Sequence, residues 1–168
     1  KAEIVSGPLT LIILGLVFGS IVAAFLPIGV GVATVAAAMG MTIWLSNVTD
    51  VTQYATNIIT LIGIGVSIDY SLFLVSRFRE ELANDRDVRT AIAMSTATAG
   101  KAVFFSGITV AIGLMGMLFF ENTSLPSLGI GGTVAVSIAM VYSTIVLPAV
   151  MSILGKRVDK GKIPFAFN

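Results

Sequence analysis

The stretch from Tyr54 to Leu82 constrains the fold of this chain more than any other. It is a run of apolar and small residues, long enough to cross a bilayer, that carries one acid, Asp69, in its interior before it ends at Arg77. At about 1.5 Å of rise per residue, Asp69 lies roughly 12 Å inside Arg77 along a helix axis. Because an aspartate side chain is too short to reach the headgroups from there, we expect it to face other helices, a partner group or a wet cavity.

Composition places the chain among membrane proteins. Of its 168 residues, 56% are hydrophobic and only 11% are charged, whereas soluble domains average about 25% charged residues. Its mean hydropathy is +1.00. The lack of cysteine and histidine removes thiolate chemistry and the common metal ligands, so we expect no metal and no cofactor. The net charge of +1 gives no reason to expect a nucleic-acid partner.

Apolar runs predict one all-α, polytopic membrane domain over residues 1–168, with five transmembrane helices. Pro8 suits the first turn of the first helix, and Pro27 with Ile28 is predicted to form a tight turn after it. Trp44 is expected to be an interface anchor. The predicted spans are residues 8–26, 28–45, 54–77, 102–120 and 128–151.

The basic residues predict the orientation of these spans. Nine of the ten Lys and Arg residues fall in two segments that share one side of the membrane if all five spans cross. By the positive-inside rule that side is cytoplasmic. The cytoplasmic parts are then the charged segment 77–101 and the tail 152–168, and the extracytoplasmic parts are residue 1 and the polar loops 46–53 and 121–126.

The charges that follow the third span allow two interpretations. Arg77, Arg79, Glu80 and Glu81 are most simply a solvated helix end, where cations also complement the helix dipole. The alternative is that they form salt bridges between helices or take part in conformational coupling. The moderately polar segment 90–100 is predicted to form a helix that lies along the membrane surface.

Asp69 is the strongest candidate for function. Acids inside membrane spans mark ion or proton pathways, and a carboxyl that gains and loses a proton there can couple proton flow to a change of shape. A structural hydrogen bond to a neighbouring helix is the alternative. Tyr70, about 100° away around the helix, is a candidate to relay the proton or to hydrogen-bond a partner helix. The alternative is an ordinary buried or lipid-facing tyrosine. Gly63 and Gly65 either permit close packing or loosen the helix near the acid.

Two stripes of hydroxyl side chains are candidates to line a hydrated path to Asp69. Such hydroxyls usually bond their own backbone or a neighbouring helix, and the sequence does not choose between the stripes. The fourth span carries Ser106 and Thr109, and the fifth carries Thr133, Ser137 and Thr144.

Residues 63–82, which read GIGVSIDYSLFLVSRFREEL, resemble the MMPL family of the resistance–nodulation–division (RND) transporters. Members of that family carry Ile/Val-Asp-Tyr in their fourth helix, followed by Phe-Leu and Ser-Arg-Phe/Tyr-Arg-Glu-Glu. Less specific agreement at Leu16–Gly31, Thr49–Gly65 and Ile145–Phe165 extends the resemblance over nearly the whole chain.

The resemblance implies that the chain corresponds to the second through sixth helices of the first half of such a transporter. Asp69 and Tyr70 then belong to a proton site that is completed by the second half. Members export lipids or other hydrophobic compounds across the bacterial inner membrane, driven by protons. The implied partners are protons, membrane lipid, a lipid or hydrophobic substrate, the second transmembrane half and the extracytoplasmic porter domains. A start at Lys1 without a signal-peptide pattern also suggests a piece of a longer chain.

Two other functions remain open at this point. The five-helix unit also resembles a sterol-sensing domain, so a lipid-sensing or scaffold module without transport is one alternative, with Asp69 in a fixed hydrogen bond. The other is an assembly of copies of this half that pairs Asp69 across a twofold axis. The sequence contains no phosphate loop, metal cluster or nucleophile with a nearby base, so an enzyme is not expected.

Overall fold

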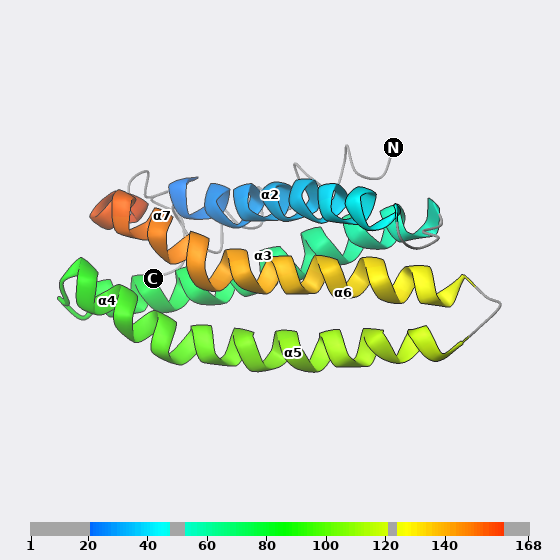
Figure 1. Cartoon of the computed structure of the whole chain (residues 1–168). Coiled ribbons are helices and arrows are strands. Elements are labelled where there is room, and N and C mark those ends of the chain that lie inside the picture. Colours follow the sequence, from blue (N-terminus) through cyan, green and yellow to red (C-terminus); the bar gives the residue numbers. More distant parts are fainter. Residues whose placement is uncertain (1–20, 48–52, 121–123, 160–168) are drawn as a thin grey trace.

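The computed structural model describes residues 21–47, 53–120 and 124–159. Over these ranges the chain is helical and contains no strand (Figure 1). Four stretches are long and apolar enough to cross a membrane: Val22–Leu45, Ala55–Ala83, Val88–Phe119 and Leu125–Leu154. The predicted all-α, multi-pass class is therefore confirmed for the described residues, in which four candidate spans are found. The first predicted span, 8–26, lies outside the described residues up to position 20.

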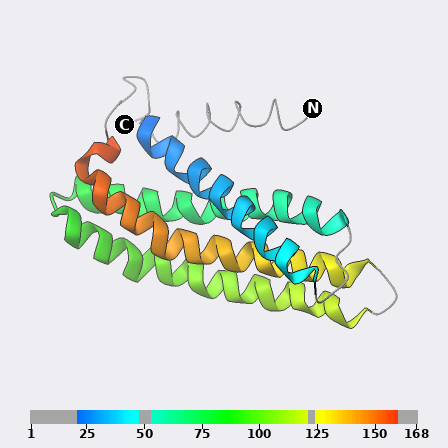
Figure 2. The ribbon, with the colours of Figure 1, turned by 45° about the horizontal axis from the view of Figure 1, so that its top comes forward.

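Four of the helical elements are long, and the shorter ones extend or connect them. α3 and α6 each contact most of the other elements, and α2 crosses obliquely over both (Figure 2). α5 packs on α6 on the side away from α2 (Figure 1). In chain order the elements are α2 (Ile21–Leu45), α3 (Gln53–Ala83), α4 (Val88–Ser95), the π-helical η1 (Thr96–Gly100), α5 (Lys101–Met115), the 3₁₀ turn η2 (Gly116–Phe119), α6 (Leu125–Val141), the π-helical η3 (Tyr142–Val146), α7 (Leu147–Leu154) and the 3₁₀ turn η4 (Gly155–Asp159).

Pro27 lies inside α2, so the tight turn predicted at Pro27 and Ile28 is wrong. Proline removes one helical hydrogen bond, which costs about 3 kcal/mol in the interior of a soluble helix. In a membrane helix the cost is tolerated, because neighbouring helices and local adjustments satisfy the freed carbonyl, and leaving the helix would expose more backbone to lipid. The Pro27 ring is less than 2% exposed and is therefore packed against the rest of the protein.

Residues 90–100 do not form a separate helix along the membrane surface, so that prediction is wrong. α4, η1 and α5 follow one another without a break from Val88 to Met115. Ala91, Ser95 and Ala99 are buried, so this segment packs against the bundle. Sequence polarity was misleading here because Thr90 and Thr98 are exposed, whereas the side chains that face the bundle, Ala91, Ser95 and Ala99, are small enough to allow close approach.

Glycines set the close contact of α6 with its neighbours. A Cβ atom added at Gly129 would lie 2.8 Å from the backbone oxygen of Leu114, and one added at Gly131 would lie 3.1 Å from the backbone oxygen of Ala55. Membrane helices associate through such close packing of small residues. The glycines of α6 therefore fix how near this helix lies to α3 and α5.

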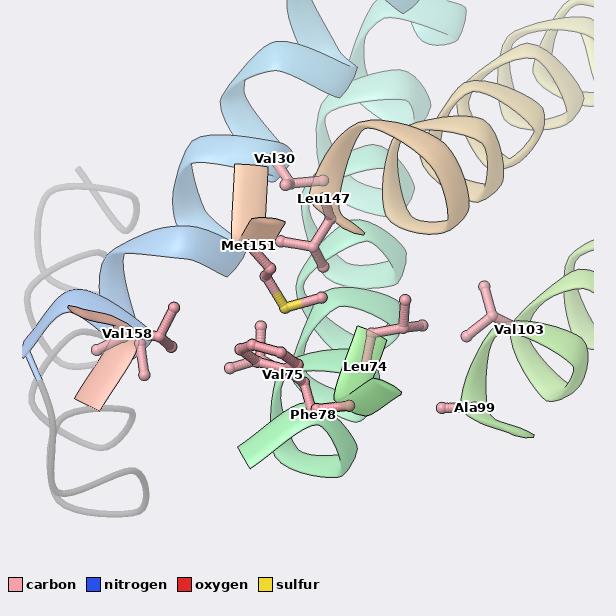
Figure 3. Close-up of a cluster of buried hydrophobic side chains, with 12 residues drawn as sticks. Val30, Leu74, Val75, Phe78, Ala99, Val103, Leu147, Met151 and Val158 are labelled. Carbon is pink, nitrogen blue, oxygen red and sulfur yellow. The ribbon is translucent and has the colours of Figure 1, made fainter. Parts of the chain in front are cut away.

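A cluster of buried apolar side chains closes one end of the bundle (Figure 3). The same end carries the loop between α3 and α4 and the turn after α7 (Figure 1), and Val88 lies beside Gly155, which has a positive φ of 52°. The loop that carries Arg86 and the turn that carries Arg157 therefore lie at the same end of the bundle. The labelled members of the cluster are Val30, Leu74, Val75, Phe78, Ala99, Val103, Leu147, Met151 and Val158.

Candidate functional site

Asp69 is the central residue of the span Ala55–Ala83, fourteen residues from either end. That separation corresponds to roughly 21 Å of helix on each side. The side chain is exposed on the surface of the described chain. An acid at the middle of a membrane span cannot face hydrocarbon without a large cost, so it must be covered by protein or water. The described part of the chain leaves that cover open.

Asp69 lines an open groove of about 340 Å³ between α3 and α5, which we call the acid groove. Phe73 adds an aromatic wall one helical turn further along α3. Among the described residues that line the groove, Tyr70 and Ser106 are polar, and Asp69 is the one acid or base among them. The residues that line the acid groove are Asp69, Tyr70, Phe73, Ala102, Val103 and Ser106.

Tyr70 joins the two sides of the acid groove. Its hydroxyl donates a hydrogen bond to Ser106 Oγ on α5, with an oxygen–oxygen distance of 3.5 Å. This distance is at the long end for such a bond, so the contact holds the ring only weakly. The structure thus brings together three of the residues selected from the sequence: Asp69, Tyr70 and Ser106.

The other hydroxyl residues selected from the sequence lie away from the acid groove. Thr109 and Thr144 each bond the carbonyl of the residue four positions earlier, Phe105 and Met140. Thr133 instead reaches the carbonyl of Ala111 on α5, at 3.5 Å. Ser137 is partly buried in α6. None of these four lines the acid groove, which favours their role in backbone bonding and packing over a path to Asp69.

Gly63 and Gly65 differ in their surroundings. A Cβ atom at Gly63 would lie 3.3 Å from Val35 Cγ2, whereas nothing lies within 4 Å of one at Gly65. Gly63 therefore serves the packing of α3 on α2. Gly65 is not required by packing within the described chain, so the idea that it loosens the helix stays a prediction.

Glu81 is a buried acid that sequence reasoning placed at a solvated helix end. Its side chain is 2% exposed and lies between two arginines, with Oε1 at 2.6 Å from Arg77 Nη2 and Oε2 at 2.8 Å from Arg86 Nη1. The contact with Arg86 is an ion pair without hydrogen-bond geometry. Glu80 also pairs with Arg77, at 2.6 Å, but is 60% exposed. The pair with Arg86 joins α3 to the loop that follows it, whereas the two pairs with Arg77 lie within α3.

A second groove lies between α2 and the segment formed by η3 and α7, which ends the continuous helix 125–154 that we call the last long helix. Its volume is about 420 Å³, and Tyr142 supplies the one hydroxyl among its lining side chains. Apart from the phenol of Tyr142, the side chains that line this groove are apolar. The groove is therefore better suited to binding an apolar ligand than to transferring a proton. The residues that line it are Val22, Phe25, Leu26, Gly29, Val30, Ala33, Tyr142, Val146, Leu147 and Val150.

The sequence model of the MMPL family matches residues 1–164 of this chain. The chain belongs to the MMPL family. The family resemblance inferred from the Asp-Tyr block of α3 is thereby confirmed, and the apolar helices identify a multi-pass membrane protein of this family.

Several MMPL relatives are similar over nearly the whole chain. The trehalose monomycolate exporter MmpL3 of Mycobacterium tuberculosis is 40% identical, over 100% of this chain and 18% of the relative. The mycolic acid-containing lipids exporter MmpL11 of Mycolicibacterium smegmatis is 42% identical, over 91% of this chain and 16% of the relative. A membrane protein of Streptomyces coelicolor is 40% identical, over 96% of this chain and 23% of its own length. The chain thus spans less than a quarter of each of these relatives.

Proposed function

We propose that this chain is the proton-coupling transmembrane module of an exporter that moves lipids or other hydrophobic compounds outward. In this proposal Asp69 binds and releases the coupling proton, and Tyr70 orients or relays it. The observation that carries the proposal is the position of Asp69, exposed at the middle of a membrane span in a groove that it shares with Tyr70 and Ser106.

The physical basis is the cost of a charge inside the bilayer. A charged side chain at the centre of a membrane helix costs about 2.5–3.5 kcal/mol on insertion scales. A protonated Asp69 avoids this cost, so a packed, dry arrangement of the groove favours the protonated acid and a wet arrangement favours the carboxylate. Proton binding therefore shifts the balance between two arrangements by their difference in proton affinity.

Asp69 in the acid groove has to be shielded from lipid by another part of the protein or by a partner. In a longer protein the second transmembrane half would cover Asp69, and extracytoplasmic porter domains would take up the substrate. A second copy of this chain, paired across a twofold axis, would cover the same face. We place the protein in the bacterial inner membrane, with the loop 84–87 and the tail 152–168 in the cytoplasm and residue 1 and loops 46–53 and 121–126 outside. The cytoplasmic segment predicted at residues 77–101 is shortened to this loop because the spans Ala55–Ala83 and Val88–Phe119 contain the rest of it.

The substrate class follows from the relatives. Two of them are named as exporters of trehalose monomycolate and of mycolic acid-containing lipids. The sequence similarity covers nearly the whole of this chain, including α3, which carries Asp69. Energy coupling is therefore the part of the relatives' function that we assign to this chain. We therefore propose a lipid or a similarly hydrophobic substrate, with its selection left to parts of the protein beyond this chain.

The test is export by the full-length protein that carries Asp69→Asn. Asparagine keeps the size of the side chain but cannot exchange the proton, so export of a labelled lipid to the outer surface should fall to background. Asp85→Asn is the matched control, because Asp85 is exposed in the loop after α3, and it should export normally. Export at the wild-type rate by the Asp69 variant, present at wild-type level in the membrane, refutes the proton role.

The groove between α2 and the last long helix favours a second candidate, a lipid-sensing or scaffold module. Its apolar lining and its volume of about 420 Å³ suit an acyl chain or a sterol. Under this alternative the protein would bind lipid in that groove, and its function would not depend on a proton at Asp69. Widening the side chain of Ala33, which lines the groove, to Phe should then abolish function, whereas Asp69→Asn should spare it.

A further inference from the structure

Three consecutive residues of α3 face three different surroundings. Asp69 lies in the open acid groove, Tyr70 bonds Ser106 on α5, and Ser71 is 0% exposed on the opposite side of the helix. Residues two positions apart are about 200° apart around an α-helix. If a change in the protonation of Asp69 makes α3 rotate or slide, Ser71 must therefore also move within the packed interior.

Ser71 makes its contact with the last long helix. Its Oγ lies 3.4 Å from Oγ of Ser143, which is also 0% exposed, and either hydroxyl can be the donor. The contact spans 72 positions of sequence. Other hydroxyls on these helices instead bond their own backbone, as Ser67 does with the carbonyl of Gly63 and Thr144 with that of Met140. Ser71 and Ser143 thus form a side-chain hydrogen bond with each other across the helix interface.

Ser143 lies in the π-helical turn η3, between α6 and α7. Pro148 follows this turn, near the start of α7, and a proline removes one backbone hydrogen bond and crowds the carbonyl four positions earlier. A π turn holds about one residue more than an α turn, so closing it would turn the following helix by about 100° and shift it by about 1.5 Å, and moving it along the helix would do the same to the segment that it passes. The contact of Ser71 is therefore made to a place where the helix can change its winding.

The packing beyond the serine pair carries such a movement onward. Leu74 lies one turn beyond Ser71, and Leu147 lies one turn beyond Ser143; both are 0% exposed members of the buried cluster that also holds Met151 (Figure 3). The cluster is filled with apolar side chains, and packed interiors transmit strain because they compress little. A displacement at the serine pair thus reaches α7.

We propose that Ser71 and Ser143 are a positioning pair that couples the movement of α3, driven by the charge of Asp69, to the π turn of the last helix. This inference rests on the proposed function and deepens it, because it names the path by which proton binding changes the shape of the bundle. Neither serine touches the proton; both act through the helix that carries Asp69.

The test uses a disulfide in a chain that has no cysteine of its own. The full-length protein, freed of any other cysteine, carries Ser71→Cys and Ser143→Cys and is reconstituted in liposomes with a pH-sensitive dye inside. Reduced, the two thiols are larger than the hydroxyls and weaker hydrogen-bond partners, so proton flux should fall by about fivefold, as expected for one lost hydrogen bond, and remain well above background. Oxidised, the pair should lock α3 to η3, and flux should fall to background and return on reduction. A pair that does not form the disulfide, or that conducts equally when oxidised, overturns the proposal.

Alanine variants of the two serines provide a second test of the positioning pair. Ser71→Ala and Ser143→Ala should each lower proton flux about fivefold, the effect of one lost hydrogen bond, and the double variant should be no slower than either single one. Ser67→Ala and Thr144→Val are matched controls, since their hydroxyls bond backbone, and they should conduct normally. Single alanine variants that both conduct at the wild-type rate contradict the coupling.

Asp69→Asn, measured in the same liposomes, separates this inference from the function on which it rests. If Asp69→Asn conducts normally, the proposed function fails and the serine pair has nothing to transmit. If Asp69→Asn is inactive while the oxidised cysteine pair conducts freely, the proton role stands and the positioning pair is wrong.

Discussion

Arg77 Nη2 lies 2.6 Å from Oε1 of Glu81, a carboxylate whose side chain is only 2% exposed. Arg86, in the loop after α3, reaches the other oxygen of the same carboxylate at 2.8 Å. An acid so close to the helix end would ordinarily be solvated. Here it fastens the loop between α3 and α4 to the end of α3, and so fixes where α4 starts.

Glu81→Gln should lower the stability of the protein by about 2 kcal/mol. Removing one partner of a fully buried pair costs about 3–5 kcal/mol, and the loss is smaller here because Arg77 and Arg86 are 32% and 41% exposed. The measurement is thermal or denaturant unfolding in detergent. Glu80→Gln removes a pair to the same arginine from an exposed position and should cost at most about 1 kcal/mol. Equal effects of the two variants would show that the burial of Glu81 is unimportant.

Gly129→Ala should destabilise the contact between α5 and α6. The added Cβ would lie 2.8 Å from the backbone oxygen of Leu114, and because a backbone atom cannot rotate away, the helices must separate at a cost of about 1–3 kcal/mol. Unfolding in detergent measures the loss. Gly65→Ala is the control, since nothing lies within 4 Å of its Cβ, and its stability should not fall. If Gly65→Ala keeps its stability but loses export, the loosening role predicted for this glycine is supported.

Tyr70→Phe and Ser106→Ala should affect export through one shared contact. Each variant removes the bond between Tyr70 Oη and Ser106 Oγ, so the double variant should be no more impaired than the worse of the two single ones. Because the bond is 3.5 Å long, either loss should change stability by less than about 1 kcal/mol. Additive losses in a labelled-lipid export assay would mean that the two residues act independently.

Asp87 caps the start of α4, and its contribution should depend on pH. Its carboxylate accepts a hydrogen bond from the backbone N–H of Thr90, and the pKa of Asp87 is lowered by hydrogen bonds from Thr90, first through the side chain and then through the backbone. A lowered pKa in the folded state means that the stabilisation is fully present above the unfolded value of about 3.9. It is lost as pH falls through the lower, folded value.

Asp87→Ala should therefore lower the melting temperature at neutral pH, and the difference from wild type should shrink as the pH falls below about 3.9. Asp87→Asn keeps a capping oxygen without a charge, so it should melt near wild type at neutral pH. A difference between wild type and Asp87→Ala that is constant over this pH range would contradict a cap made by the ionised carboxylate.

The sequence predicted the helical spans better than it predicted the helix ends, and it selected Asp69 and Tyr70 but not the groove that they line. Apolar length alone identifies the helix around Asp69, and the spacing of Asp69 from Arg77 places the acid inside the membrane. Pro27 was misread because the rule that proline ends a helix belongs to water, where a freed carbonyl finds a new partner. Residues 90–100 were misread because small hydroxyl residues suit a helix interface as well as a membrane surface.

Partners far apart in the chain were beyond the sequence. The burial of Glu81 depends on tertiary packing around the end of α3, where α4 is a neighbour, and no local pattern specifies this packing. The contact of Ser71 with Ser143 was also missed, although Ser67 and Ser71, four positions apart, mark a small polar stripe opposite Asp69. Such a stripe at helical spacing predicts a close helix contact, but it does not name the residue on the other side.

Proton flux through the reconstituted full-length protein tests the central claim most directly. With a pH gradient across the liposome membrane, the wild-type protein and the Asp85→Asn control should acidify the lumen at equal rates. Asp69→Asn should acidify it no faster than protein-free liposomes. An Asp69→Asn protein that is folded, inserted and as fast as the wild type would contradict the assignment of the coupling proton to this carboxyl.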